Sequence, residues 1–413
     1  MTTVGHLVTG AALAATRAHP AATSEPLVLV AIGVALVLSM VMLRRLPRPG
    51  PHTGRHTDHD LRAARAIVER HGHDSISPFI LRPDKSFEFA DGAVLAYRVV
   101  GDTAIVSGDP VGPDESVPLL LGKFFALARA QGWRVVLWGT SARHLERYRS
   151  LGLGTLCVGE EAVVDPAQFT LEGRPVRKLR QSVHRLERRG WEIIARDGRD
   201  LDAELEHEID GLELAWRAQR SRLIGFAMGM GHFESAVRPG DLYLLARAPD
   251  GQLGAVMHFI SHCGKLSLDT MRRVGETPNG VNEALVCRAL DIARRRGVAE
   301  VSLNYAGLGH LVRSTPAGGP AKRLSAKLIV KLLGRRFQMQ RLVTFNEKFS
   351  PAWRPRYLIY QSRLSLPVAV LRVLQAEGYV RQPRWSRAGD GPLLLPRALP
   401  RTHAERPGIG DAR

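Results

Sequence analysis

An acid and a base lie three residues apart in the run LDTMRR, residues 268–273, which has the pattern of a strand end. The turn Pro278-Asn279-Gly280 follows, and a helical pattern begins there. A carboxylate such as Asp269 can orient or deprotonate a hydroxyl or hold an ammonium group, and the guanidinium fork of Arg272 suits a phosphate. A strand end that faces solvent would look similar, so the interpretation depends on the elements around it.

The elements that must position these side chains alternate between helix and strand. Apolar periodicity together with glycine and proline stop signals predicts both types. The predicted helices are 60–72, 117–132, 142–152, 174–190, 201–220, 279–297 and 321–333. The predicted strands fall within 93–113, 133–141, 154–165, 191–197, 241–273 and 299–306. The same rhythm of helix, strand meander, helix and strand occurs twice, which is compatible with a duplicated α/β fold.

Composition limits the possible partners. The chain has 413 residues, of which 45% are hydrophobic, and a formal net charge of +18. The chain therefore has enough apolar residues for a hydrophobic core of ordinary size. The excess positive charge favours nucleic acid or anionic lipid as a partner. Cys157, Cys263 and Cys287 have no CxxC spacing, so neither a disulfide framework nor a zinc site is indicated, and no metal is expected.

The N-terminal region predicts a membrane anchor. Residues 27–43 are uncharged and mostly apolar, and as a helix they would extend about 26 Å, near the lower limit for a bilayer span. Four arginines follow the segment, at positions 44, 45, 48 and 55. The positive-inside rule then places the bulk of the chain in the cytoplasm. A cleaved signal peptide is disfavoured because the positive charge lies on the wrong side of the apolar run.

These observations divide the chain into successive regions. The predicted regions are a short segment (1–25), a transmembrane helix (26–43), a basic linker (44–59), a first α/β unit (60–168), a second α/β unit with the active site (169–365), and a C-terminal extension (366–413) that is disordered beyond about 383. The protein is accordingly expected at the cell membrane as a single-pass protein whose catalytic part is cytoplasmic.

Residues from about 60 to 363 resemble the catalytic domain of the phosphatidylglycerol lysyltransferases, the aminoacyl-phosphatidylglycerol synthase family. The pieces that carry the resemblance occur in family order: SGDPVGP (107–113), the stretch 152–192, LDTMRRVGETPNGVNEAL (268–285), VSLNYAGLGHL (301–311) and FNEKFSPAWRPRYLIY (345–360). The resemblance implies two tandem acetyltransferase-like (GNAT-like) units with a tunnel between them. It also implies transfer of an aminoacyl group from aminoacyl-tRNA to phosphatidylglycerol.

The resemblance also implies site residues. Asp269, Arg272 and Lys348 fall on the functional positions of the family and are the predicted catalytic residues. The predicted substrate-binding residues are Asn279, Glu283, Asn304 and Arg356. Turn chemistry for Asn279 and a solvated helix face for Glu283 remain open as alternatives. An aminoacyl-tRNA is already an activated ester, so no cofactor is expected.

The predicted helix 174–190 is strongly basic on one side. Leu179, Val183 and Leu186 share its apolar face. The predicted tRNA-binding residues on the remaining surface are Arg177, Lys178, Arg185 and Arg188. Phosphate contacts of this number would make binding depend steeply on salt. A solvated basic face that binds nothing is the alternative.

The sequence therefore predicts an enzyme that transfers an aminoacyl group, lysyl in the first instance, from aminoacyl-tRNA to phosphatidylglycerol and so reduces the negative charge of the membrane surface. Two alternatives stay open: a different acceptor such as diacylglycerol or a cell-wall precursor, and a non-catalytic basic protein that binds lipid or RNA. The chain has one predicted span where well-known family members have many. It also has Asn346 where a basic residue is expected and LNYAG in place of LGMAP, and these substitutions concern the choice of amino acid.

Overall fold

The computed structural model describes residues 56–219, 239–307, 339–378 and 380. The predicted segment 1–25, membrane helix 26–43 and most of the linker 44–59 lie outside these residues, as do the predicted helix 321–333 and the tail beyond about 383. In the part of the chain that the structure describes, no helix is long and apolar enough to cross a membrane.

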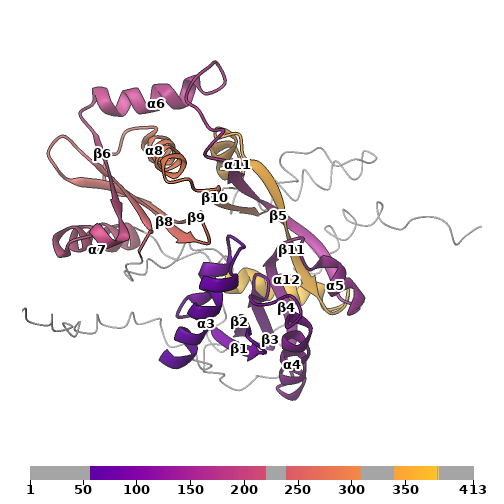
Figure 1. Ribbon diagram of the computed structural model, residues 1–413. Helices are drawn as coiled ribbons and strands as arrows, with labels where there is room; N and C mark the ends of the chain where they lie inside the picture. The colour runs from indigo at the N-terminus through magenta and orange to yellow at the C-terminus, as the bar shows by residue number, and fades with distance from the viewer. Residues whose placement is uncertain (1–55, 220–238, 308–338, 379, 381–413) are drawn as a thin grey trace, which may run out of the picture.

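The described residues form a mixed α/β structure, as predicted (Figure 1). Its α-helices are α3 (Asp58–His71), α4 (Val117–Ala130), α5 (Leu145–Ser150), α6 (Arg177–Arg188), α7 (Ala203–Ala218), α8 (Val281–Arg295), α11 (Met339–Glu347) and α12 (Leu366–Ala376), with short 3-10 helices η2 (Ser77–Leu81) and η3 (Gly198–Asp200). Its strands are β1 (Ser86–Ala90), β2 (Ala93–Val100), β3 (Thr103–Ser107), β4 (Arg134–Thr140), β5 (Gly154–Val164), β6 (Glu192–Asp197), β7 (Leu242–Arg247), β8 (Leu253–His262), β9 (Lys265–Arg273), β10 (Glu300–Gly307) and β11 (Ala352–Tyr360).

These strands form one 11-stranded sheet in the order β1-β2-β3-β4-β11-β5-β10-β9-β8-β7-β6. In the first half, β1, β2 and β3 are antiparallel, and α4 then carries the chain to β4, which is parallel to β3. In the second half, β6 to β9 are antiparallel, and α8 carries the chain to β10, which is parallel to β9. Parallel neighbours require such a crossover helix. The two halves therefore share one topology from β1 to β4 and from β7 to β10, and β6 is an additional strand at the edge of the second half.

The last strand of each half lies beside a strand of the other half. β5 pairs with β10, β11 pairs with β4, and β5 and β11 pair with each other from Tyr360↔Gly154 to Ala352↔Val163. Figure 1 shows β5 and β11 between the two groups of helices. Backbone hydrogen bonds of these strands thus cross between the halves, so the boundary predicted near residue 169 divides the chain but not the sheet.

Side chains alternate between the two faces of the sheet and pack against helices on both. In β3, Ala104 and Val106 pack with α4, whereas Ile105 packs with α12. In β8, Met257 packs with α8 whereas Val256 packs with α7. α7 and α8 therefore cover opposite faces of the second half. α12, the start of the predicted C-terminal extension, completes the core of the first half.

Residues 72–82, which we call the bridging segment, belong to the first half and pack against the sheet of the second half. Ile76 and Phe79 pack against Ile260 of β8. Ile260 has the same alternation as Val256, so the bridging segment covers the sheet face on which α7 also lies. A side-chain contact supports the junction, since Nδ1 of His262 lies 3.2 Å from the carbonyl oxygen of Gly72. The candidate site lies under this segment.

Candidate active site

A β-bulge in β9 determines where Asp269 points. His258 of β8 is paired with Thr270, and the next residue, Phe259, is paired with Leu268, so Asp269 is an extra residue without a partner opposite it. A bulge of this kind redirects a side chain and is common beside active sites. Asp269 is only 4% exposed. The predicted catalytic acid therefore lies inside the protein.

Asp269 is the centre of a buried chain of charged side chains. Nη2 of Arg82, in the bridging segment, donates to Oδ1 of Asp269 at 2.6 Å. Nδ1 of His258 bonds Oδ2 of Asp269 at 3.0 Å, and its Nε2 bonds Oδ2 of Asp241 at 3.3 Å. The ring of Tyr243 stacks on this imidazole with 4.3 Å between centroids. The chain of contacts runs from the first half of the sheet to the start of β7.

The protonation states follow from these contacts. Burial opposes a charge on His258, but the hydrogen bonds to Asp241 and Asp269 outweigh burial and raise its pKa to about 9. Burial also acts to raise the pKa of Asp269, but the charges of Arg82 and His258 outweigh it and lower that pKa below its ordinary value. At neutral pH, Asp269 is thus a carboxylate and His258 an imidazolium. A carboxylate of low pKa orients groups or holds a cation better than it removes a proton.

Arg272 is paired within the second half of the sheet. Its Nε donates to Oε2 of Glu213 on α7 at 2.8 Å, and its guanidinium carbon lies 3.7 Å from the ring centroid of Trp216. The side chain is 2% exposed. Burial lowers the pKa of Arg272, with Glu213 acting in the opposite direction. In this arrangement Arg272 joins β9 to α7.

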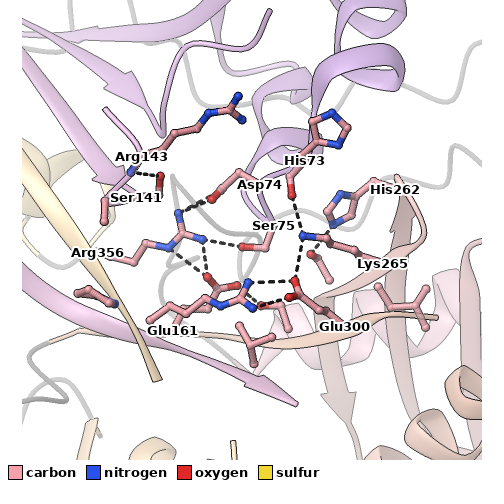
Figure 2. A pocket seen from close by; sticks show the side chains of 17 residues that line it. His73, Asp74, Ser75, Ser141, Arg143, Glu161, His262, Lys265, Glu300 and Arg356 are labelled. Carbon is pink, nitrogen blue, oxygen red and sulfur yellow. Dashed lines mark hydrogen bonds and ion pairs between the residues drawn. The ribbon is translucent and has the colours of Figure 1, made fainter. Parts of the chain in front are cut away.

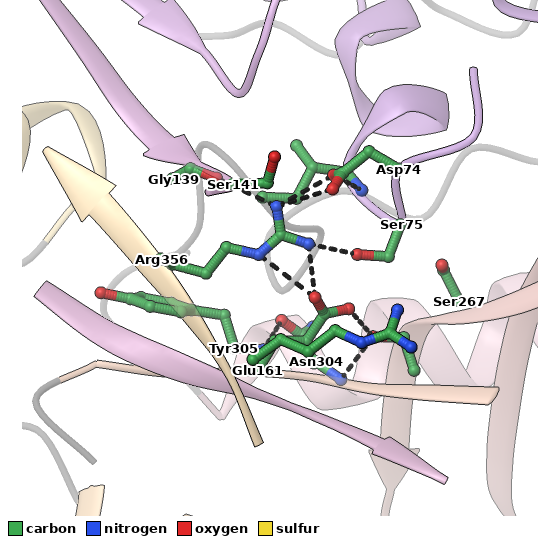
Figure 3. A network of polar contacts seen from close by, with 12 residues as sticks. Asp74, Ser75, Gly139, Ser141, Glu161, Ser267, Asn304, Tyr305 and Arg356 are labelled. Atoms are coloured by element: carbon green, nitrogen blue, oxygen red, sulfur yellow. Dashed lines mark hydrogen bonds and ion pairs between the residues drawn. The ribbon is translucent and has the colours of Figure 1, made fainter. Parts of the chain in front are cut away.

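Arg356 lies at the junction of the two halves. Its guanidinium contacts Glu161 of β5, both carboxylate oxygens of Asp74 at 3.0 and 2.9 Å, and Oγ of Ser75 at 2.8 Å (Figure 3). Burial opposes the charge of Arg356, but Asp74 and Glu161 raise its pKa well above the ordinary value. Arg356 therefore fastens the bridging segment to the two exchanged strands.

A cavity of about 300 Å³ lies beside Arg356 (Figure 2). Lys265 and Arg354 on its wall both pair with Glu300 and lower the pKa of that carboxyl to about 2, with the Arg354 hydrogen bond the main cause. His262 also lines the cavity, and burial lowers its pKa, so the neutral imidazole accepts from Oγ of Ser267 at 2.9 Å. The cavity is accordingly polar, with charges of both signs on its wall.

Asn304 joins this cavity to the Asp269 cluster. It lies at an irregular position in β10 with φ +80°, a conformation that asparagine tolerates better than most residues. Its backbone N–H donates to Oγ of Ser302, which in turn donates to Glu161. Its Nδ2 donates to the carbonyl oxygen of Leu268, next to Asp269, at 3.5 Å. The structure thus connects two predicted substrate-binding residues, Asn304 and Arg356, through Glu161.

Lys348 and Glu283 lie elsewhere. Nζ of Lys348 donates to Oε1 of Glu283 at 2.6 Å and lies 5.6 Å from the ring centroid of Phe345. Glu283 belongs to the first turn of α8, which covers the sheet face opposite to α7. In the described residues no contact joins this pair to Asp269. The predicted catalytic set is therefore not brought together: Asp269 and Arg272 share one face, and Lys348 lies on the other.

The turn before α8 rests on α6. The carbonyl oxygen of Asn279 accepts from Nη1 of Arg185 at 3.4 Å. Gly280 has φ +98°, and a Cβ there would lie 2.7 Å from the Cβ of Ser182, so only glycine fits. The predicted tRNA-binding residues Arg177, Lys178, Arg185 and Arg188 are all exposed on α6. The structure places them on one surface away from the Asp269 cluster.

Several residues of the cluster are absent from the predicted site: Arg82, Asp241, His258, Asp74 and Glu161. Arg82 and Asp269 are separated by 187 positions in the chain, so no local pattern could connect them. A usable signal existed for His258, because it is a polar residue inside the apolar run LGAVMHFI of β8. A histidine in such a run must find polar partners, and here they are Asp241 and Asp269.

Lys85 is a further buried ionisable group near the cluster. It is 1% exposed, and its Nζ donates to the carbonyl oxygen of Phe79 at 2.7 Å and to Oγ of Ser107 at 3.0 Å. Burial lowers its pKa to about 7. Ser107 begins the segment SGDPVGP, so this segment of the first half helps to hold the bridging segment. Within the described ranges, no group of three or more His, Cys, Asp or Glu side chains is arranged to hold a metal ion.

Comparison with known proteins bears on the identity of this fold and site. The family described as "Phosphatidylglycerol lysyltransferase, C-terminal" matches residues 65–360. Proteins named "Lysylphosphatidylglycerol biosynthesis bifunctional protein LysX" are similar over most of this chain. The relative from Rhodococcus jostii (strain RHA1) is 32% identical over 87% of this chain and 32% of its own length. The relative from Mycobacterium marinum (strain ATCC BAA-535 / M) is 34% identical over 79% of this chain and 30% of its own length.

Solved structures are also similar to this chain. The C-terminal domain of a putative lysylphosphatidylglycerol synthetase from Agrobacterium fabrum has a TM-score of 0.65 and 25% identity, covering 79% of this chain and 99% of that chain. L-PGS from Bacillus licheniformis has the same fold, with a TM-score of 0.64, 24% identity and the same coverage. The chain spans about a third of the length of the curated relatives and nearly all of each solved structure.

Proposed function

Because the chain belongs to the phosphatidylglycerol lysyltransferase C-terminal family, we propose that it transfers an aminoacyl group, lysyl in the first instance, from aminoacyl-tRNA to phosphatidylglycerol. Relatives that are at least 30% identical are named for lysylphosphatidylglycerol biosynthesis, which supports the lipid product. The matched residues include every described residue of the Asp269 cluster and of the cavity beside Arg356. The chain corresponds to about a third of the length of those relatives.

The observation that carries the proposal is a buried carboxylate next to a polar cavity at the junction of two repeated halves. Ser267 lines the cavity, and Asp269 lies two residues further along β9. A reaction between two substrates that arrive separately requires a site that both can reach and that holds polar groups away from bulk water. The polar cavity at the junction of the halves supports this proposal, with Asp269 beneath Arg82 rather than on the cavity wall.

The chemistry needs no added energy source. The hydroxyl oxygen of the lipid attacks the ester carbonyl, the bond to the tRNA ribose oxygen breaks, and the hydroxyl proton passes to that leaving oxygen. Asp269 remains charged because Arg82 and His258 lower its pKa. We assign it to orienting the attacking hydroxyl or holding the α-amino group of the aminoacyl moiety. Reaching it requires a shift of Arg82, whose guanidinium covers one carboxylate oxygen.

The remaining predicted assignments form part of the same proposal. Arg356 lines the substrate cavity and Asn304 holds the β9 backbone at Leu268, whereas Arg272 positions β9 through Glu213. Residues 26–43 anchor the chain, and the arginines after them keep the catalytic part in the cytoplasm. The repeated halves, 60–168 and 169–365, correspond to two acetyltransferase-like units with exchanged last strands. The product carries an added amine and lowers the negative charge of the inner leaflet.

Expression in a host that lacks aminoacylated lipids tests the proposal. Lipids are extracted and new species are identified by mass spectrometry, with Asp269→Ala and Arg272→Ala as comparison variants. A lysyl adduct of phosphatidylglycerol supports the proposal, and another aminoacyl adduct of the same lipid would correct the donor. An adduct on diacylglycerol or a cell-wall precursor would replace the acceptor. Absence of any new species, with the protein folded and expressed, would favour a non-catalytic lipid- or RNA-binding protein.

A further inference from the structure

A second, larger hollow lies at the far end of β9, about 880 Å³ in volume. We call it the α6–β9 hollow, because its wall is formed by the C-terminal end of α6, the start of β6, the end of β9 and the turn before α8. Its lining includes Arg189, Trp191, Gln219, Arg273, Thr277 and Asn279. Its volume is within the roughly 300–1,000 Å³ range typical of small-molecule sites. None of these residues contacts the Asp269 cluster in the contacts described above.

Two arginines that line the hollow are not paired with an acid in the described part of the chain. Among the described residues, neither the guanidinium of Arg189 nor that of Arg273 has a hydrogen-bond or ion-pair partner. The neighbouring Arg272 differs from Arg273, because it is buried and paired with Glu213. One acid, Glu276, lines the hollow and is exposed. The hollow therefore offers two open guanidinium forks, which match the geometry of phosphate groups.

The indole of Trp191 also lines the hollow. Trp191 is partly buried and packs against the core of the second half. A Cβ on Gly254 would lie 2.6 Å from Cη2 of Trp191, so the glycine lets the indole lie directly on the backbone of β8. Amide and hydroxyl side chains of Gln219, Thr277 and Asn279 complete the wall. A hollow lined by an aromatic ring, unpaired arginines and polar side chains has the composition of a site on which nucleobases stack.

We propose that the α6–β9 hollow binds the single-stranded 3′ end of the RNA donor. Nucleobases stack on Trp191 while Arg189 and Arg273 bind the adjoining phosphates. The exposed basic residues of α6 continue the positive surface away from the hollow, toward a duplex stem. Arg273 is four residues beyond Asp269 on β9, about 13 Å along the strand, which places the hollow near the reaction centre. This inference rests on the proposed use of aminoacyl-tRNA.

A membrane surface is the competing occupant, and the lining argues against it. The large hydrophobic side chains that are most exposed among the described residues, Leu119, Leu151, Leu214 and Leu364, do not line the hollow. Lipid docking generally combines cations with exposed aliphatic side chains that enter the acyl boundary. The hollow combines cations with an aromatic ring and amides, which suits RNA.

Binding measurements on the full chain in neutral detergent test the proposal. The probe is a fluorescently labelled single-stranded RNA that ends in CCA, followed by anisotropy, and a second arm uses vesicles that contain phosphatidylglycerol. Trp191→Ala is expected to weaken RNA binding about 5- to 100-fold, the range for loss of one stacked base. Trp191→Phe should retain most of the affinity. Arg273→Gln should lower the salt dependence by about one phosphate contact.

Arg129→Gln on α4 is the matched control, because Arg129 is exposed and lies in the first half. It should leave RNA affinity unchanged, and thermal unfolding identifies variants that have lost the fold. Unchanged RNA affinity in folded Trp191→Ala and Arg273→Gln proteins would overturn the proposal, as would weakened vesicle binding with RNA binding intact. If RNA binding falls in these variants but the parent chain makes no aminoacyl lipid, the hollow is confirmed and the proposed reaction fails. If the aminoacyl lipid is made but the KM for aminoacyl-tRNA is the same in the variants as in the parent, the proposed reaction is supported and RNA binding by the α6–β9 hollow is refuted.

Discussion

Replacing His258 with glutamine removes the imidazolium that lies between Asp241 and Asp269. The hydrogen bonds to these two carboxylates raise the pKa of His258 from 6.5 to about 9 despite burial. At about 1.4 kcal/mol per pH unit, this corresponds to about 3 kcal/mol of folding free energy. The contribution is fully present below pH 6.5, where both the folded and the unfolded histidine are charged. It is lost as the pH rises through about 9, because the folded histidine then loses its proton.

A second buried group acts in the opposite direction over the same pH range. Burial lowers the pKa of Lys85 from 10.5 to about 7, so the unfolded chain binds one proton more than the folded chain between these values. Stability therefore rises with pH through this window on account of Lys85, and the two contributions partly cancel in the parent protein. The comparison of His258→Gln with the parent removes this cancellation, because both proteins contain Lys85.

Urea unfolding of the full chain in detergent, followed by tryptophan fluorescence from pH 6 to pH 10, measures the difference. The destabilisation caused by His258→Gln should be about 3 kcal/mol larger at pH 6 than at pH 10. His59→Gln is the control, because His59 is exposed on α3 and should show no such dependence. A destabilisation by His258→Gln that does not vary with pH would refute the assignment of a charged imidazole between the two carboxylates.

Three further changes test other contacts. Arg272→Gln removes one of the two arginines that pair with the buried carboxylate of Glu213, while Arg217 still holds its Oε1, so urea unfolding should show a loss of about 2 kcal/mol. Gly280→Ala adds a Cβ against Ser182 at a φ of +98°, and should lower the unfolding free energy by about 2 kcal/mol; the double variant with Ser182→Gly should recover part of it. Lys348→Met breaks a half-exposed pair on the α8 face, so stability should change by less than about 1 kcal/mol, and transfer activity should persist if Lys348 does not contact substrate.

The controls for these variants come from similar positions. Arg288→Gln removes an exposed helix pair with Asp291 and should change stability by less than about 0.5 kcal/mol. Gly251→Ala has φ +84° but no atom within 4 Å of the added Cβ, so it isolates the backbone strain from the clash. An Arg272→Gln effect as small as that of Arg288→Gln would contradict the buried pair. Complete loss of transfer by a stable Lys348→Met protein would show that Lys348 is needed for the reaction.

Local pattern predicts most of the elements in this chain. The helices α3, α4, α6 and α8 and the strands of both meanders follow from apolar periodicity and glycine or proline stop signals. The predicted elements do not include β1, α11, β11 or α12, although SFEFA of β1 has the alternation of a strand. The exchange of β5 and β11 could not be predicted, because pairing between strands about 200 residues apart depends on the whole fold. Neither strand has a sequence pattern that identifies its partner.

In the candidate site, some residues could be predicted from the sequence and their partners could not. A charged Asp269 in a strand run and a polar Asn304 near a strand end are visible as anomalies in the sequence, and both lie at irregular points of the sheet. Their partners are not visible, because Arg82 belongs to a different half and His258 becomes meaningful only when β8 and β9 are paired. Family resemblance suggested Lys348 as a third member, and the geometry separates it from Asp269 since Glu283 holds it on α8.

The central claim, that the carboxylate of Asp269 serves aminoacyl transfer to lipid, is tested most directly by one rate comparison. The purified full chain and its Asp269→Asn variant are each given radiolabelled lysyl-tRNA and phosphatidylglycerol vesicles, and lysyl lipid is counted over time. We expect transfer by the parent chain and a loss of at least about 100-fold in the variant, with the fold retained. Equal transfer by the two folded proteins would contradict it.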